Sequence, residues 1–211
     1  MLTQPDALII IFAREPVLGQ VKTRLIPALG ADRATELYKR LLDYTINNVI
    51  SASLSPMRLC ITPESEQQYF MQMKHAQHFE LTVQEGTDLG LRMFNALATA
   101  LAQYSKVILI GTDCPSIEQS LLQQAIDALE HNDMVFSPAS DGGYVLIGAI
   151  RVVKEVFIDI DWGTDKVMQQ SRLALAGSDL SWQELSVQHD VDIKADLKYL
   201  SLHDEFKDFI A

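Results

Sequence analysis

Seven apolar residues stand in one unbroken run near the start of the chain, Ala7-Leu8-Ile9-Ile10-Ile11-Phe12-Ala13. A run this rich in isoleucine, with no polar residue inside it, is typical of a strand that is covered on both faces. A second run of the same kind is Val107-Ile108-Leu109-Ile110-Gly111. Weaker strand candidates occupy residues 57–61, 79–83, 134–137 and 144–149.

Helical patterns lie between these strands. Apolar residues recur at helical spacing over residues 32–50, 89–104 and 116–130, with Asp32 and Ser116 as expected N-caps. A last helix is expected over residues 195–209. Strands that alternate with helices predict a mostly parallel central sheet between two helical layers, which is an α/β fold of the three-layer α/β/α sandwich type. No repeat or linker interrupts the chain, so we expect a single domain over residues 1–211, whose irregular last third lines the site.

The charge of the chain limits the classes of partner that it is expected to bind. It has 17 Lys and Arg against 28 Asp and Glu, a formal net charge of −11. Such an acidic chain is not expected to bind nucleic acid or an anionic membrane, because affinity for phosphate backbones comes from Lys and Arg. A small anionic ligand remains compatible with this charge, since its site needs only a local group of cations or a bound metal.

The two cysteines, Cys60 and Cys114, lie in or beside apolar runs and lack the spacing of metal ligands. Buried, reduced thiols are favoured over a disulfide or a reactive thiol. The N-terminus lacks the basic segment of a signal peptide, and no apolar stretch reaches the ~20 residues that a membrane helix needs. We therefore expect a soluble, cytoplasmic protein.

The loop after the first strand concentrates positive charge. Arg14, Lys22 and Arg24 fall within eleven residues, while Pro16 and Gly19 keep the next helix from starting at once. Ligands of open α/β sheets bind beyond the carboxyl ends of the strands, so this loop is a candidate site for a di- or triphosphate. The alternative is a surface loop of solvated basic residues. The loop is neither a P-loop nor a Gly-x-Gly-x-x-Gly fingerprint.

Three aspartates are candidate metal ligands. Asp113 follows the second strong strand, where a carboxylate either forms a turn or holds a magnesium ion. Because a residue at a strand end is not core, we expect Asp113→Ala to remove metal-dependent nucleotide binding and leave the fold intact. Asp190 and Asp192 are two residues apart and would face one side of an extended backbone, with a divalent cation relieving their repulsion. The alternative is a pair of solvated residues that complement the dipole of the last helix.

Two adjacent glycines follow Asp141. Gly142 and Gly143 allow positive φ or a close approach of the backbone to a ligand. A tight turn between two strands explains the same residues, since Asp-Gly is an ordinary hairpin signal. Each of these features has such a structural explanation by itself, and it is their combination in one α/β chain that favours a site.

Five segments carry a resemblance to a known family, and they occur in the family's order along nearly the whole chain. They are Phe12-Ala13-Arg14-Glu15-Pro16-Val17-Leu18-Gly19-Gln20-Val21-Lys22-Thr23-Arg24-Leu25, Gly111-Thr112-Asp113-Cys114-Pro115, Pro138-Ala139-Ser140-Asp141-Gly142-Gly143-Tyr144-Val145-Leu146-Ile147-Gly148, Ile160-Asp161-Trp162-Gly163-Thr164 and Asp190-Val191-Asp192-Ile193-Lys194-Ala195-Asp196-Leu197. On these segments the chain resembles the radical-SAM/selenodomain-associated transferase 1 family of the nucleotide-diphospho-sugar transferase (GT-A) superfamily. It is also similar to the guanylyltransferases of deazaflavin and molybdenum cofactor synthesis. It departs from the family at Gly163, where a small hydroxyl residue is usual, and at Ile193, where threonine is usual.

The resemblance implies a fold of the GT-A type and a site of several parts. Nucleotide and phosphate binding would fall to residues of the first loop: Arg14, Gly19, Lys22, Thr23 and Arg24. A Mg²⁺ or Mn²⁺ ion would be held by three carboxylates: Asp113, Asp190 and Asp192. The acceptor or sugar pocket would be lined by residues of the later motifs: Gly142, Gly143, Tyr144, Trp162 and Thr164. Catalytic roles would fall to Asp113, Asp141 and Lys22, with Asp141 orienting or deprotonating an acceptor hydroxyl.

The expected function is a metal-dependent transfer from a nucleotide-activated donor, either a nucleoside triphosphate or a nucleotide sugar, to a small-molecule acceptor. Such chemistry depends on positioning and electrostatic stabilisation, and no Ser-His-Asp or Cys-His set stands out in the sequence. The short chain and the cationic loop favour nucleotidyl transfer, whereas the family resemblance favours glycosyl transfer. Two further alternatives are a non-catalytic nucleotide-binding regulatory protein and a metal-dependent phosphohydrolase. The sequence holds no signal for an oligomeric state.

Overall fold

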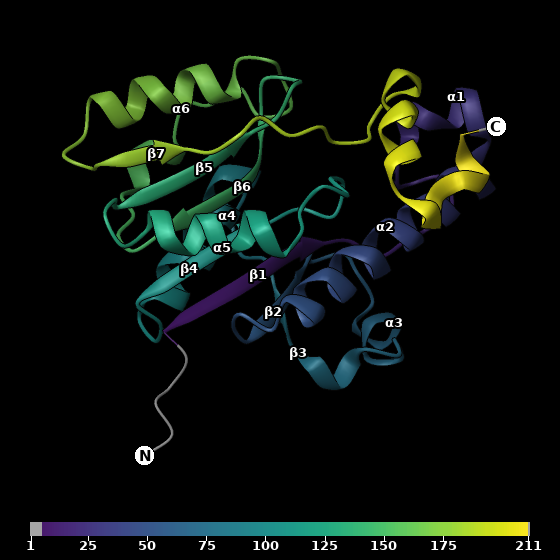
Figure 1. Cartoon of the computed structure of the whole chain (residues 1–211), viewed down its shortest axis with the longest axis horizontal. Helices are drawn as coiled ribbons and strands as arrows, with labels where there is room; N and C mark the ends of the chain where they lie inside the picture. Colours follow the sequence, from purple (N-terminus) through teal and green to yellow (C-terminus); the bar gives the residue numbers. More distant parts are fainter. Residues whose placement is uncertain (1–5, 211) are drawn as a thin grey trace.

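The computed structural model describes residues 6–210 of the chain, which form a sheet of seven strands in the order β3-β2-β1-β4-β6-β5-β7 (Figure 1). The strands are β1 (Ala7–Ala13), β2 (Met57–Ile61), β3 (Phe79–Val83), β4 (Lys106–Ile110), β5 (Met134–Pro138), β6 (Tyr144–Ala149) and β7 (Trp182–Glu184). The α-helices are α1 (Ile26–Leu29), α2 (Ala31–Ala52), α3 (Gln67–Met71), α4 (Leu89–Leu101), α5 (Gln119–Ala128) and α6 (Val167–Ala176). The 3₁₀ helices are η1 (Thr23–Leu25), η2 (Ala76–His78), η3 (Lys154–Phe157), η4 (Lys194–Leu202) and η5 (Asp204–Phe209).

The sheet is mixed but mostly parallel. β1 pairs in parallel with β2 and β4, β2 with β3, and β5 with β7, while β6 is antiparallel to both β4 and β5. The two strands predicted from isoleucine-rich apolar runs, β1 and β4, lie side by side in the sheet. All of β4 is buried, and β1 is buried apart from the half-buried Phe12, as expected of strands covered on both faces. The predicted α/β fold with a mostly parallel central sheet is confirmed.

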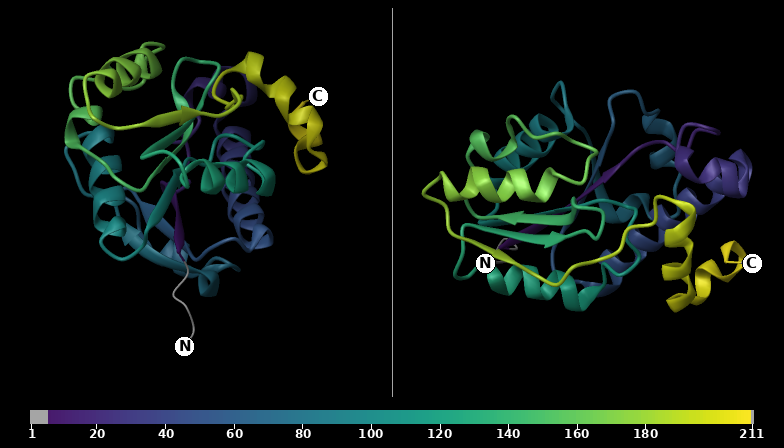
Figure 2. Two further views of the ribbon diagram at one scale, coloured as in Figure 1. Left: turned by 60° about the vertical axis from the view of Figure 1, so that its left-hand side comes forward. Right: turned by 90° about the horizontal axis from the view of Figure 1, so that it is seen from above.

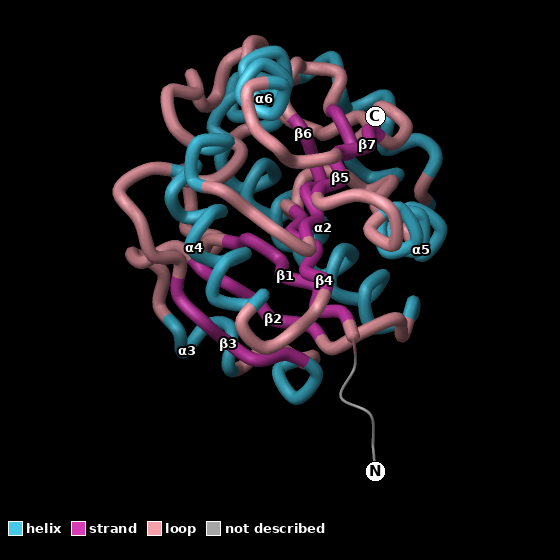
Figure 3. The backbone as a smooth tube through the Cα atoms, turned by 90° about the vertical axis from the view of Figure 1, so that its left-hand side faces the viewer, coloured by secondary structure: helices cyan, strands magenta, loops and turns pink. Residues whose placement is uncertain are grey.

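Helices cover both faces of the sheet (Figure 3). On one face α2 and α5 pack on the strands through side chains such as Leu42 and Leu122. On the other face α4, α6 and η3 do the same through Leu97, Leu175 and Phe157. These side chains are fully or almost fully buried, and burying each of them contributes roughly 1.5–3 kcal/mol, which holds the helices on the sheet. No helix within residues 6–210 combines the length and the apolar character that crossing a bilayer would need.

A third apolar cluster fixes the C-terminal segment on the first helices. In Figures 1 and 2 the yellow C-terminal segment lies beside α1 and one end of α2. Leu200, Phe206 and Phe209 of η4 and η5 pack in one cluster with Leu37 and Leu41 of α2. This packing holds the chain after β7 close to the loop that follows β1. The single-domain organisation remains a prediction.

Two expected helix starts and the type of one expected helix were wrong. α2 begins at Ala31 after Gly30, whose φ of 79° is left-handed, so Asp32 lies in the first turn and does not cap the helix. α5 begins at Gln119, and the Ser116 hydroxyl instead donates a hydrogen bond to Gln188 Oε1 (2.6 Å). The expected last α-helix is two 3₁₀ segments, η4 and η5, because their apolar side chains turn onto α2 and tertiary packing overrides the helical pattern.

Both cysteines are buried core thiols, as the sequence predicts. Cys60 and Cys114 are free, and burial raises the pKa of both thiols, that of Cys114 to about 11. Since the thiolate is the reactive form, we expect neither to react with Ellman's reagent in the folded protein at pH 8, and both to react in guanidinium chloride. Rapid labelling of either thiol in the native protein would contradict this packing.

Candidate functional site

The directions of the strands bring several connecting segments to one edge of the sheet. β1 to β4 run in parallel, and β5 points the same way because two antiparallel steps through β6 restore the direction. The segments that follow these strands therefore leave from one carboxyl edge. The chain after β7 also crosses this edge on its way to the C-terminal helices (Figure 2). This topology explains why Arg14, Lys22, Asp113, Asp141 and Asp190, far apart in sequence, come to the same edge.

Lys22 is the buried centre of this edge. Its backbone is left-handed (φ 48°, ψ 40°) and its side chain is only 3% exposed. The Nζ atom lies 2.7 Å from Asp113 Oδ1 and donates a hydrogen bond of 2.6 Å to the Val191 carbonyl. One ammonium thus ties the loop after β1 to the segments after β4 and β7. A left-handed residue other than glycine costs about 1–3 kcal/mol and is typical of functional sites.

Two other residues predicted in this loop, Gly19 and Thr23, have different surroundings. Gly19 has a φ of 75°, and a Cβ atom there would meet nothing within 4 Å. The neighbouring space is therefore open, and the backbone there is accessible to a ligand. Thr23 is exposed and begins η1, directly after Lys22.

The segment around Val191 is held against the edge. The Val191 N–H donates to the Asp113 carbonyl (2.8 Å), and the Val191 side chain is fully buried in the third apolar cluster. The residues on either side have different neighbours. Asp192 Oδ2 accepts a hydrogen bond of 2.8 Å from Arg24 Nη1, in a largely exposed ion pair. Asp190 instead lies near the negative charges of Asp141 and Asp113.

Asp190 and Asp192 would face one side of an extended backbone, and in the structure the two carboxylates have different charged neighbours. The backbone is not a continuing strand at this point, because it turns into η4. The Asp196 carboxylate makes this turn by accepting hydrogen bonds from the N–H groups of Asp192 (3.0 Å) and Ile193 (2.8 Å).

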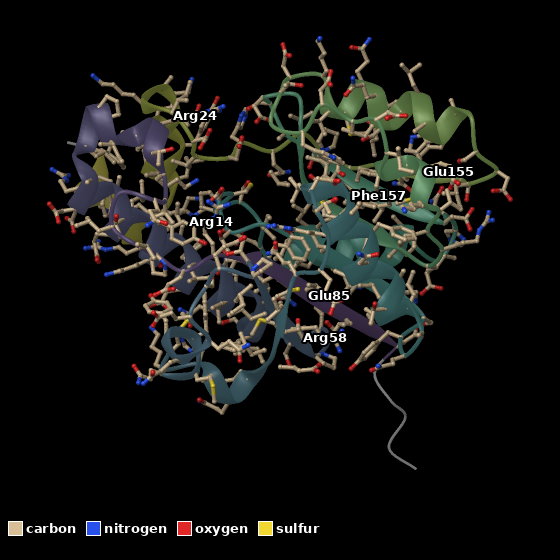
Figure 4. The ribbon with its side chains drawn as sticks, turned by 180° about the vertical axis from the view of Figure 1, so that it is seen from behind. Arg14, Arg24, Arg58, Glu85, Glu155 and Phe157 are labelled. Carbon is tan, nitrogen blue, oxygen red and sulfur yellow. The ribbon has the colours of Figure 1, made fainter. Side chains whose placement is uncertain are left out.

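Arg14 is the loop cation without a partner in the described part of the chain: its guanidinium makes no hydrogen bond or ion pair there, and the residue is exposed (Figure 4). Its backbone is fixed instead. The Tyr38 hydroxyl accepts from the Arg14 N–H (3.0 Å) and donates to the Arg14 carbonyl (3.1 Å). The next residue is fixed too, because the Glu15 N–H donates to Ser65 Oγ (2.9 Å) and Glu15 Oε2 accepts from the Glu66 N–H (2.8 Å). Arg14 is therefore a solvent-facing cation on a rigid base.

Asp141 stands in the turn of the β5–β6 hairpin. The turn is joined to the segment after β7, since the Ser140 N–H donates to the Gln188 carbonyl (3.0 Å) and Ser140 Oγ lies 2.9 Å from His189 Nδ1. Asp141 Oδ1 accepts from the Gly143 N–H (2.9 Å). The hairpin turn that the Asp-Gly signal indicates is present, and it carries Asp141 to the candidate site.

Gly142 is required by the packing of this turn. Its φ is 94°, and its carbonyl accepts a hydrogen bond from the Met168 N–H (2.8 Å) near the start of α6. A Cβ atom at Gly142 would lie 2.1 Å from the Asp165 carbonyl oxygen. Only glycine therefore fits between the hairpin and the segment before α6.

Asp113, Asp141 and Asp190 form an acidic group beside Lys22. The pKa of Asp190 is raised to about 6. Burial is the largest cause, followed by the negative charges of Asp141 and Asp113, and the positive charge of Lys22 lowers it. The two neighbouring carboxylates add to the rise because they disfavour a further negative charge. A cation that entered this group would relieve the repulsion.

A divalent cation fits this donor set in part. Mg²⁺ is often held by one or two carboxylates together with waters and substrate phosphates, and Mn²⁺ also prefers oxygen ligands. Asp113 and Asp190 meet that description. Within residues 6–210, no group of three or more His, Cys, Asp and Glu side chains is arranged to hold a metal ion. Of the three predicted ligands, Asp113 is paired with Lys22 and Asp192 with Arg24, and their binding of a metal stays a prediction.

The residues predicted for an acceptor pocket include an aromatic pair. The rings of Tyr144 and Trp162 meet edge to face with their centroids 6.3 Å apart, and burial raises the pKa of Tyr144. Trp162 packs on α4 at Gly90, where a Cβ atom would lie 2.7 Å from Trp162 Nε1. Thr164 Oγ1 donates to the Asp161 carbonyl (2.8 Å), so this hydroxyl closes the turn before α6.

Sequence reasoning missed the segment between β3 and α4. Gln84 is buried, and its side-chain amide donates to the carbonyls of Ala13 (3.4 Å) and Cys60 (3.0 Å), which joins the ends of β1 and β2. The signal in the sequence is Gly86-Thr87-Asp88-Leu89-Gly90, two glycines around an aspartate, which two residues separate from the end of β3. Asp88 caps α4 by accepting from the Leu91 N–H (2.9 Å).

A cavity of about 340 Å³ lies between α4 and the β2–β3 side of the sheet, where Figure 4 labels Arg58 and Glu85. Its lining residues are Ile10, Arg58, Cys60, Thr82, Val83, Glu85, Asn95, Ala96 and Thr99. Arg58 is already paired there with Glu80, through Nε (2.9 Å) and Nη2 (2.8 Å). None of the predicted site residues lines this cavity, so the candidate site remains the carboxyl edge.

Solved structures share this fold and define its class. A protein from Desulfovibrio desulfuricans G20, described provisionally as a nucleotide-diphospho-sugar transferase, is 32% identical with a TM-score of 0.87, over 93% of this chain and 87% of that one. A 4-diphosphocytidyl-2C-methyl-D-erythritol synthase from Anaerococcus prevotii DSM 20548 is 13% identical with a TM-score of 0.60, over 93% and 95% of the two chains. Rv0371c from Mycobacterium tuberculosis H37Rv, in complex with manganese, is 16% identical with a TM-score of 0.53, over 93% and 98%. The chain has the fold of the nucleotide-diphospho-sugar transferases, and the last two structures show the fold alone.

The sequence also matches a family model. Residues 45–164, more than half of the chain, match the family described as "Uncharacterized protein conserved in bacteria (DUF2064)", and the chain belongs to this family. The matched residues include Asp113 and Asp141, whereas Lys22 and Asp190 lie outside them. A comparison with curated proteins finds no match.

Proposed function

We propose that this protein is a metal-dependent transferase that takes a nucleotide-activated donor and passes part of it to a small-molecule acceptor. The observation that carries the proposal is the ion pair of the buried Lys22 with Asp113, at the edge to which Asp141 and Asp190 also come. A buried cation and carboxylates at the carboxyl edge of an α/β sheet suit a polyphosphate that arrives with a metal. The description of the 32% identical relative supports the same class.

Each group has a task in such a transfer. Arg14 would bind donor phosphates through its planar guanidinium, and Lys22 would stabilise the negative charge of the leaving group. Mg²⁺ or Mn²⁺, held by Asp113 and Asp190, would neutralise charge on the phosphates. Asp141 would orient the acceptor hydroxyl. No protein nucleophile is needed, because such reactions depend on positioning and electrostatic stabilisation.

The remaining predicted residues keep their proposed roles. Gly19, Thr23 and Arg24 would contact the nucleotide, and Asp192 would join the metal only after its ion pair with Arg24 opens. The acceptor or sugar pocket would be lined by Gly142, Gly143, Tyr144, Trp162 and Thr164. We also propose one domain over residues 1–211, a cytoplasmic location, and no binding of nucleic acid or membrane.

For the donor we propose a nucleotide sugar, so that an acceptor hydroxyl attacks the sugar and a nucleoside diphosphate leaves. The support is the description of the relative from D. desulfuricans, together with the resemblance to the radical-SAM/selenodomain-associated transferase 1 family. The alternative is nucleotidyl transfer, in which an acceptor phosphate attacks the α-phosphate of a nucleoside triphosphate and diphosphate leaves. The short chain and the cationic loop after β1 favour that alternative. The two reactions are distinguished by the leaving group, which is a nucleoside diphosphate in the first and diphosphate in the second.

A thermal-shift screen tests the donor class. Nucleoside triphosphates and nucleotide sugars are added at about 100 times their Kd, with Mg²⁺, with Mn²⁺ and with EDTA. Binding to the folded state at that excess contributes about 2.7 kcal/mol, which raises the Tm by about 5–10 °C for a chain of this length. We expect a nucleotide sugar to give this rise with metal and a smaller rise with EDTA.

The other outcomes are distinguishable. No shift with any nucleotide contradicts the proposal. A shift without product in any acceptor mixture would indicate a regulatory nucleotide-binding protein. Release of phosphate or diphosphate from a nucleotide alone, with no acceptor present, would indicate a phosphohydrolase.

A further inference from the structure

Tyr38 of α2 is a buried residue to which neither the sequence motifs nor the proposed transfer gives a role. Its hydroxyl makes two hydrogen bonds to one residue, accepting from the Arg14 N–H (3.0 Å) and donating to the Arg14 carbonyl (3.1 Å). A tyrosine hydroxyl has one donor and two acceptor positions, so both bonds can exist together. Burial, and to a smaller extent the charge of Asp113, raise the pKa of Tyr38 to about 12, so the hydroxyl keeps its proton at neutral pH.

The residue that Tyr38 holds differs from the other two cations of the loop. Lys22 and Arg24 are each directed by an ion pair, to Asp113 and to Asp192. The Arg14 guanidinium has no such partner within residues 6–210, so its direction follows from its backbone. Arg14 is also the first residue after β1, where the sheet no longer fixes the chain. A side chain on a fixed backbone loses less conformational freedom when it binds, which increases affinity.

We propose that Tyr38 is a positioning residue for phosphate binding, which holds the Arg14 backbone so that the guanidinium is presented to the phosphates of the donor. The inference rests on the proposed function, because it takes phosphate as the ligand of Arg14. The rest of the loop has supports of its own. Glu15 is bonded to Ser65 and Glu66, and Lys22 to Asp113, so within this loop the loss of the Tyr38 hydroxyl should act at Arg14.

The test compares two tyrosines of the same helix. Tyr38→Phe removes only the hydroxyl, and Tyr44→Phe is the matched control, because the Tyr44 hydroxyl bonds His203 Nδ1 (2.9 Å) in the C-terminal segment. The probe is inorganic diphosphate with Mg²⁺, titrated at low salt by calorimetry into the full chain. We expect about tenfold weaker binding in Tyr38→Phe, the effect of losing one or two net hydrogen bonds, and an unchanged affinity in Tyr44→Phe.

Two further measurements separate positioning from a general structural effect. In an Arg14→Ala background, Tyr38→Phe should cause no further loss of diphosphate affinity, because its effect passes through Arg14. Hydrogen exchange of the Arg14 amide should be faster in Tyr38→Phe than in the wild type, since this amide donates to the missing oxygen. That second readout needs no ligand.

Each contrary result has its own meaning. If the wild-type protein binds no diphosphate, the proposed function and this inference both fail. If the wild type binds and Tyr38→Phe binds equally well although the Arg14 amide exchanges faster, only this inference fails. A tenfold loss that persists in the Arg14→Ala background also overturns it, because Tyr38 would then act through another residue.

Discussion

Asp113→Ala is expected to abolish transfer and also to lower the free energy of unfolding by about 1–3 kcal/mol. The second effect comes from Lys22, whose ammonium would stay buried with only the Val191 carbonyl as partner. Removing one member of a fully buried pair costs about 3–5 kcal/mol, but Asp113 is 47% exposed and water can partly replace it. Guanidinium denaturation gives the stability, and product formation with Mn²⁺ gives the activity, expected to fall by about 100-fold or more.

The double variant Lys22→Met with Asp113→Ala is the control for this result. It removes both charges while methionine keeps most of the apolar stem, so its stability should return to within about 1 kcal/mol of the wild type. Transfer should remain absent. If Asp113→Ala alone is as stable as the wild type, the ion pair has no structural role. If the double variant still transfers with metal, the roles assigned to Lys22 and Asp113 are wrong.

The sheet and its carboxyl edge could be predicted because they follow from local patterns. Unbroken apolar runs identify β1 and β4, and helical spacing identifies α2 and α4, so the carboxyl edge could be expected before any contact was known. The place of β6 between β4 and β5 could not be predicted. The apolar run of β6 does not depend on which strands lie beside it, because strand pairing is decided by contacts between distant parts of the chain.

The ion pairs at the candidate site could not be predicted from the sequence either. Lys22 was expected to bind phosphate and Asp113 to bind metal, and no local pattern shows that residues 91 positions apart bind each other in the folded chain. Tyr38 is missed for a related reason. It lies within the apolar pattern of α2, where its hydroxyl gives no periodic signal. A buried hydroxyl that bonds the backbone of a loop cannot be told from a core residue by the pattern, whereas exposed cations and carboxylates are found by their type.

Gly142→Ala is expected to lower the free energy of unfolding by about 3–5 kcal/mol, which corresponds to a Tm lower by roughly 10 °C. Part of the loss is the positive φ of 94°, which costs an L-residue about 1–2 kcal/mol. The rest comes from the new Cβ atom, which would lie 2.1 Å from the Asp165 carbonyl oxygen, so that the backbone must move. Such a movement would also displace Asp141, the preceding residue, and transfer should be lost in the folded fraction.

Gly163→Ala separates the two parts of this loss. Gly163 has a similar positive φ of 81°, but a Cβ atom there meets nothing within 4 Å, so only the backbone strain of about 1–2 kcal/mol is expected. The difference in stability between the two variants therefore measures the contact between the hairpin turn and the segment before α6. Equal losses would contradict that contact. Full activity in folded Gly142→Ala would contradict the role of the hairpin turn, because Asp141 could then move without affecting the transfer.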